Sequence, residues 1–131
     1  MINDTISDML TRIRNANLIK NESVCVLNTK TNQRIGELLK KQGYIESIKI
    51  SSQNVNLIKI KLKYNNNSKK PCITNLKRLS SPGLRIYSTY KKIPRILNGM
   101  GTIIISTSKG LMTDHEARVN KIGGEILFSI W

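Results

Sequence analysis

Three hydroxyl side chains followed by a lysine and a glycine form the segment of this sequence best suited to bind another molecule. The segment runs Ser106, Thr107, Ser108, Lys109 and Gly110. Hydroxyl groups both donate and accept hydrogen bonds, so they suit base edges and the 2′-hydroxyl groups of ribose. A lysine ammonium neutralises a phosphate, and a glycine lets the backbone come close to a ligand. Judged by spacing alone, an ordinary surface loop remains the favoured interpretation.

The elements predicted on either side would hold this segment in place. Thr102–Thr107 contains three successive isoleucines, which is typical of a buried central strand. Thr113 and Glu116 have the spacing of a capping box, which satisfies free N–H groups at the start of a helix. We therefore expect a short helix at Met112–Lys121 and a final strand from Gly124 to the C-terminal tryptophan.

Residue types that perform catalysis are sparse and scattered in this sequence. There are 8 acidic residues and 1 histidine, and neither the P-loop pattern nor G-x-G-x-x-G occurs. Cys25 and Cys72 lie far apart and predict two reduced packing residues rather than a zinc site. We accordingly predict a protein that is not an enzyme, with no catalytic site, no metal, no cofactor and no small-molecule substrate.

The distribution of charge indicates an anionic partner. The formal net charge is +14, and the stretch from Ser47 to Thr113 holds 13 Lys or Arg and no Asp or Glu. Ordinary soluble surfaces mix both signs, whereas release of counterions from phosphates drives Lys and Arg onto nucleic acid. A polyphosphate partner is therefore favoured over a solvated basic surface without a ligand. An anionic membrane is disfavoured because no basic amphipathic helix occurs, and no apolar run approaches the roughly 20 residues of a membrane span.

Apolar residues recur at helical spacing in two segments near the N-terminus. The first stripe consists of Ile6, Met9, Leu10 and Ile13. Asn3 or Asp4 is the expected N-cap of this helix. The second stripe consists of Ile35, Leu38 and Leu39. Thr31 or Asn32 is its expected N-cap, and Gly43 is its expected left-handed stop.

Alternating apolar and polar residues predict the strands that complete this first unit. Val24 and Val26 indicate one short strand. Ile45–Ile50 and Val55–Leu62 predict a hairpin with one buried face and one basic face. The basic face carries Lys59, Lys61 and Lys63. The first unit then has the order α-β-α-β-β and ends near Tyr64.

The run from Asn65 to Pro71 is polar and typical of a linker. We therefore predict an N-terminal α/β subdomain at 1–64, a linker at 65–71 and a C-terminal subdomain at 72–131. Further elements of the second half are expected as strands at Cys72–Leu79 and Leu84–Tyr90 and a helical turn at Ile93–Leu97. The predicted fold class is α+β, with two small α/β subdomains packed together, the second mostly β with short helices.

Several segments of the chain, taken in order, closely resemble the bacterial-type small-subunit ribosomal protein family eight. The matching segments are Asp8–Ala16, Leu76–Arg78, Ser81–Tyr87, Ser106–Arg118 and Ile122–Leu127, followed by the terminal Trp131. The similarity runs over essentially the whole chain without a large insertion. It implies a structural protein that binds the central domain of small-subunit rRNA directly, at an internally looped helix. It also implies early assembly of the platform and contacts with neighbouring small-subunit ribosomal proteins.

The resemblance also assigns roles to individual residues. It makes the C-terminal subdomain at 72–131 the rRNA-binding one. The main RNA contact falls on the serine-rich loop, at Ser106, Thr107, Ser108 and Lys109, with Gly110 shaping the loop. Arg85 and Tyr87 match the family's basic-aromatic strand, and Glu125 is expected to brace or join the same surface. In the first helix, Arg12 and Arg14 are expected to give secondary contacts to the RNA backbone. The outward lysines Lys59, Lys61 and Lys63 are further expected secondary contacts.

Two questions of context stay open at this point. Ile93–Gly101 is more similar to plastid members of the family than to free-living bacterial ones. Together with the Asn-, Ile- and Lys-rich composition, this predicts a ribosome of the plastid (chloroplast) stroma, with the bacterial cytoplasm as the alternative. The alternative function is a free RNA-binding translational repressor, because bacterial members of the family can do both.

Overall fold

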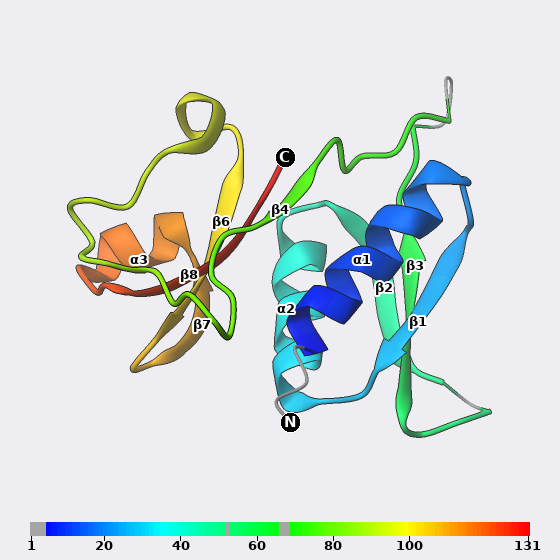
Figure 1. Ribbon diagram of the computed structural model, residues 1–131. Helices are drawn as coiled ribbons and strands as arrows, with labels where there is room; N and C mark the ends of the chain where they lie inside the picture. Colours follow the sequence, from blue (N-terminus) through cyan, green and yellow to red (C-terminus); the bar gives the residue numbers. More distant parts are fainter. Residues whose placement is uncertain (1–4, 52, 66–68) are drawn as a thin grey trace. The chain divides into compact units, whose positions relative to one another are not determined.

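The chain forms two compact units. The computed structural model describes residues 5–51, 53–65 and 69–131. The N-terminal unit is Thr5–Thr74 and the C-terminal unit is Asn75–Trp131 (Figure 1). Both contain helices and antiparallel strands, so the predicted α+β class is confirmed. The linker expected at 65–71 stays a prediction, and its residues 66–68 lie outside the described residues.

Two helices of the N-terminal unit follow the predicted apolar stripes. Helix α1 (Thr5–Leu18) buries Met9, Leu10, Ile13 and Ala16. Helix α2 (Lys30–Lys41) buries Asn32, Ile35, Gly36, Leu38 and Leu39. Gly43 follows α2 with φ = +84°, in the left-handed region expected of a stop. The caps expected for α1, Asn3 and Asp4, lie outside the described residues.

The predicted N-cap of α2 is wrong. Thr29 is the cap, and its hydroxyl accepts a hydrogen bond from the Asn32 N–H at 3.0 Å. Asn32 itself is buried inside the first turn, where its side-chain amide donates to the Leu27 carbonyl at 3.0 Å. The helix therefore begins at Lys30, because Asn32 ties its first turn back to the preceding strand.

Three antiparallel strands complete the N-terminal unit in the predicted order α-β-α-β-β. They are β1 (Ser23–Leu27), β2 (Ile45–Ile50) and β3 (Leu57–Leu62), with β3 between the other two. In β3 the buried residues Ile58, Ile60 and Leu62 alternate with exposed lysines. Helix α1 contacts β1, helix α2 contacts β2, and both lie on the face of the sheet that carries the buried residues (Figure 1). The basic residues consequently occupy the opposite face, as the hairpin prediction required.

The C-terminal unit is built on a five-stranded antiparallel sheet. Its strands are β4 (Leu76–Arg78), β5 (Tyr87–Ser88), β6 (Thr102–Thr107), β7 (Gly110–Thr113) and β8 (Gly124–Ile130). The order is β4-β8-β6-β7, and β5 also pairs with β8. Helix α3 (Asp114–Asn120) follows β7, and its cap is the predicted one, because the Thr113 hydroxyl accepts from the Glu116 N–H at 3.2 Å. The hydrophobic cluster of this unit consists of Ile93, Ile103, Ile105, Met112, Ala117 and Ile126.

Several elements of the C-terminal unit differ from their predicted extent. The two long strands expected before residue 91 shrink to β4 and β5. Regular pairing of β4 with β8 ends at Arg78, because the N–H groups of Leu79 and Ser80 both donate to the Leu127 carbonyl. The helical turn expected at Ile93–Leu97 is a 3-10 turn at Ile96–Gly99, in which Leu97 takes a positive φ of +50°. Met112 lies in β7 instead of starting a helix. Within the described residues, no helix has the length and apolar character needed to cross a membrane.

Candidate nucleic-acid interface

The serine-rich segment forms a tight β-hairpin. Ser106 and Thr107 end β6, Ser108 and Lys109 form the turn, and Gly110 begins β7. The Thr107 hydroxyl donates to the Gly110 carbonyl at 2.8 Å and accepts from the Lys109 N–H at 3.1 Å. Gly110 has φ = +102°, a backbone conformation that other residues adopt only with strain. Thr107 and Gly110 therefore shape a defined turn, where the sequence alone predicted only a loop.

Three groups of this hairpin are available to a ligand. Ser108 and Lys109 are exposed and Ser106 is half-buried. In the part of the chain that the structure describes, the hydroxyls of Ser106 and Ser108 make no hydrogen bond, and the Lys109 ammonium makes no ion pair. The hairpin thus presents two donor–acceptor groups and one cation, while the third hydroxyl holds the turn closed.

A row of side chains across the sheet extends from the base of this hairpin. Ser106 of β6 lies directly opposite Glu125 of β8, and Glu125 lies directly opposite Tyr87 of β5. Residues directly opposite on neighbouring antiparallel strands project to the same face. Tyr87 is 69% exposed, so its ring is accessible on that face. The register therefore brings together three predicted site residues that are far apart in the sequence.

Glu125 is the centre of a hydrogen-bond network that includes a residue the sequence analysis missed. The buried Ser80 hydroxyl donates to one Glu125 carboxylate oxygen at 2.6 Å and accepts from the Ile86 N–H at 3.1 Å. The Arg85 guanidinium donates to the other carboxylate oxygen at 3.2 Å. The Glu125 side chain is only 11% exposed, whereas that of Arg85 is 50% exposed. Glu125 consequently braces Arg85 from below, and Arg85 keeps half of its surface open to an anion.

Two glycines allow the strands of this row to come together. A Cβ on Gly124 would lie 2.1 Å from the Ser106 carbonyl oxygen, and one on Gly123 would lie 2.4 Å from the Ser88 carbonyl oxygen. Both clashes are with backbone, which cannot rotate away as a side chain can. The close approach of β5, β8 and β6 therefore requires glycine at both positions.

The expected secondary contacts lie in the N-terminal unit. Arg12 forms an ion pair with Asp8 at 3.0 Å along α1, and both side chains remain about half exposed. Arg14 is also exposed on α1. The outward lysines Lys59, Lys61 and Lys63 are all exposed. Among the described residues there is no group of three or more His, Cys, Asp or Glu side chains that could hold a metal ion.

A comparison with protein families decides which family this chain represents. The model of a family described as Ribosomal protein S8 matches residues 4–131, which is nearly the whole chain. The chain belongs to the ribosomal protein S8 family. It is therefore a structural, non-enzymatic protein of the small ribosomal subunit, and the resemblance that its sequence suggested is confirmed.

Individual relatives of the S8 family place the chain in plastids. The small ribosomal subunit protein uS8c of Tupiella akineta is 67% identical over 131 residues, covering 100% of both chains. The uS8c proteins of Oltmannsiellopsis viridis and Gracilaria tenuistipitata var. liui are 56% and 53% identical, again over 100% of both chains. Because these relatives are plastid proteins, the predicted location in a plastid ribosome is confirmed.

Proposed function

We propose that this chain binds directly to the central domain of small-subunit rRNA and helps to assemble the platform of the subunit. Membership of a small-subunit ribosomal protein family supports a partner rich in phosphate. The observation that carries the proposal is the hairpin itself, where Ser106, Ser108 and Lys109 present unpaired polar groups on a turn fixed by Thr107. Neighbouring small-subunit ribosomal proteins are further partners in this proposal.

The types of residue in the row favour an irregular RNA target over a regular duplex. The deep groove of A-form RNA excludes side chains, so sequence-specific recognition uses bulges and internal loops whose bases are unstacked. Ser106 and Ser108 suit the edges of such bases, and the exposed ring of Tyr87 suits stacking. Lys109 and Arg85 would position phosphates next to these contacts.

Thr107, Gly110 and Glu125 have supporting roles in this proposal. The Thr107 hydroxyl is engaged within the hairpin, so it fixes the turn instead of touching RNA. Gly110 supplies the backbone conformation of the same turn. Glu125 is shielded by Arg85 and Ser80, and orients the guanidinium of Arg85. The contacts expected from Arg12, Arg14 and the lysines of the N-terminal unit stay predictions of the same proposal.

Binding to separate rRNA domains tests the proposal. The intact chain is titrated into transcripts of the 5′, central and 3′ domains of plastid small-subunit rRNA in filter-binding assays at one salt concentration. We expect the central domain to bind at least about tenfold more tightly, which is about 1.4 kcal/mol. Equal affinity for all three domains would contradict the proposal. Sedimentation of a lysate separates the repressor alternative, because a free repressor would remain mostly outside the small-subunit fraction.

A further inference from the structure

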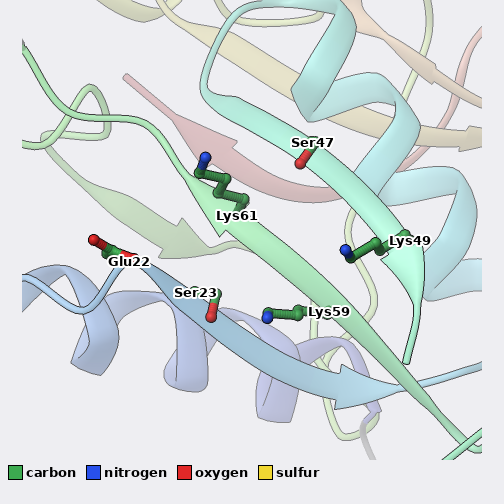
Figure 2. Close-up of a pocket in the computed structure, with 6 residues that line it drawn as sticks. All are labelled: Glu22, Ser23, Ser47, Lys49, Lys59 and Lys61. Atoms are coloured by element: carbon green, nitrogen blue, oxygen red, sulfur yellow. The ribbon is translucent and has the colours of Figure 1, made fainter. Parts of the chain in front are cut away.

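The face of the N-terminal sheet that lies opposite its two helices carries a polar depression. It has a volume of about 260 Å³. Its lining residues are Glu22, Ser23, Ser47, Lys49, Lys59 and Lys61. Figure 2 shows that they come from all three strands of the sheet and from the residue just before β1. The depression is therefore a feature of the N-terminal unit alone.

Strand register orders these side chains into two neighbouring rows. In one row Lys61 of the central strand lies between Ser23 and Ser47. In the next row Lys59 lies between Cys25 and Lys49. Because directly opposite residues share a face, three ammonium groups and two hydroxyls surround one small area of the sheet.

The second row places two like charges directly opposite each other. Cross-strand pairs of like charge destabilise a sheet. In the described part of the chain neither Lys49 nor Lys59 has an ion pair, whereas Lys61 contacts Glu46 at 3.8 Å. Glu22 is the only acid among the described residues that line the depression. The pair Lys49 and Lys59 therefore holds uncompensated positive charge, which an anion lying between the two ammonium groups would neutralise.

We propose that this depression binds a phosphate group of the rRNA backbone. Lys49 and Lys59 are its principal cations, Ser23 and Ser47 are hydroxyl donors, and Lys61 is shared with Glu46. A lysine ammonium binds phosphate as a point charge, and the non-bridging phosphate oxygens can accept hydrogen bonds from the ammonium groups and the serine hydroxyls of the lining together. The proposal rests on the proposed function and adds a second RNA contact that fixes position without reading sequence.

Lys30 provides the matched control. It is exposed at the start of α2, which packs on the other face of the sheet, and it does not line the depression. Filter binding to full-length small-subunit rRNA is measured across a series of KCl concentrations for Lys59→Gln, Lys49→Gln and Lys30→Gln. We expect each of the first two to weaken binding and to lower the salt slope by about 1, and Lys59→Arg to restore binding. Equal losses for Lys59→Gln and Lys30→Gln would overturn the site in favour of a diffuse basic surface.

The free protein supplies a check that the lysines are not structural. If the two ammonium groups repel each other, Lys59→Gln and Lys49→Gln leave the melting temperature unchanged or raise it in the absence of RNA. A clear fall in melting temperature for both variants would mean that the lysines support the fold, and would overturn their assignment to a ligand.

Cys25 is exposed and is not the packing residue that the sequence predicted. It lies directly opposite Lys59, so the reactivity of its thiol measures whether the depression is occupied. The rate of Cys25 alkylation by iodoacetamide is measured in a Cys72→Ser chain with and without protein-free small-subunit rRNA. We expect the rRNA to slow alkylation several-fold, and the double variant Lys49→Gln/Lys59→Gln to lose this protection. If Cys25 is protected from alkylation in whole small subunits but not by rRNA alone, a neighbouring protein covers this face and the proposal is overturned.

The two proposals fail in distinguishable ways. A chain with no preference for the central domain but with Cys25 protected by rRNA would lose the proposed function and keep this site. A chain that prefers the central domain while its Cys25 is alkylated at the same rate with and without rRNA would keep the proposed function and lose this site.

Discussion

Ser108→Ala and Thr107→Ala separate the part of the hairpin that contacts RNA from the part that holds its shape. The Ser108 hydroxyl is exposed and makes no hydrogen bond within the described part of the chain. Its removal should therefore leave the free energy of unfolding almost unchanged. An RNA group that pairs with this hydroxyl would be left unsatisfied, which costs about 1–2 kcal/mol, or roughly 5- to 30-fold in affinity.

Thr107→Ala should give the opposite pattern. It removes two hydrogen bonds, at 2.8 and 3.1 Å, that close the turn. At about 0.5–1.5 kcal/mol for each hydrogen bond, the free energy of unfolding should fall by about 1–3 kcal/mol. Thr107→Ser keeps the hydroxyl and should retain most of this stability, which makes it the matched control.

Competition binding and urea unfolding together decide between these expectations. Each variant is mixed with two RNAs, the internally looped helix of the central domain and a fully paired RNA of the same length, and its relative affinity for the two is measured. Ser108→Ala should lose affinity for the looped RNA and little for the paired one. Equal losses on both RNAs would refute the assignment of specificity to this hairpin. A Ser108→Ala chain that unfolds as easily as Thr107→Ala would make the residue structural.

Three further substitutions test the scaffold beneath the interface, all by urea unfolding alongside RNA binding. Ser80→Ala removes the hydroxyl that donates to a Glu125 oxygen at 2.6 Å. We expect the free energy of unfolding to fall by about 2–3 kcal/mol and RNA binding to weaken. Unchanged binding would show that the Glu125 network does not orient Arg85. Gly124→Ala forces a Cβ to within 2.1 Å of the backbone of β6 and should lower the free energy of unfolding by about 2 kcal/mol or more. An unchanged free energy of unfolding would contradict the close approach of the strands. Thr113→Ala removes the cap of α3 and should lower the free energy of unfolding by about 1 kcal/mol. RNA affinity below the melting temperature should change little. A large loss of affinity would place RNA near α3.

Elements with strong periodicity were predictable from the sequence. The helical stripe of α1 and the alternation in β3 each follow from one face that packs and one that does not. The exposed lysines of β3 followed from the same alternation. The α-β-α-β-β order of the N-terminal unit was predictable because each of its elements is long enough to show its period.

Features that depend on pairing between distant segments were not predictable in the same way. The segment 110–113 shows no strand pattern of its own, and it becomes β7 only because a two-residue turn returns it to β6. Ser80 lies in a segment whose sequence is typical of an ordinary turn, and its hydrogen-bond partner Glu125 lies 45 residues further along the chain. Lys49 and Lys59 likewise meet only through strand register. For the candidate site, the sequence indicated the residue types, but only the folded chain shows which hydroxyls are engaged.

The most direct test of the account is to map what lies next to the hairpin turn in the bound RNA. An Fe(II)-EDTA group is tethered at Ser108→Cys in a chain that also carries Cys25→Ser and Cys72→Ser, and hydroxyl-radical cleavage of full-length small-subunit rRNA is recorded. Ser108 is exposed at the tip of the turn, so the tether should cleave within a few nucleotides of its contact. We expect one cluster of strong cuts in the internally looped helix of the central domain. Cuts that are scattered along the rRNA, or clustered in another domain, would contradict it.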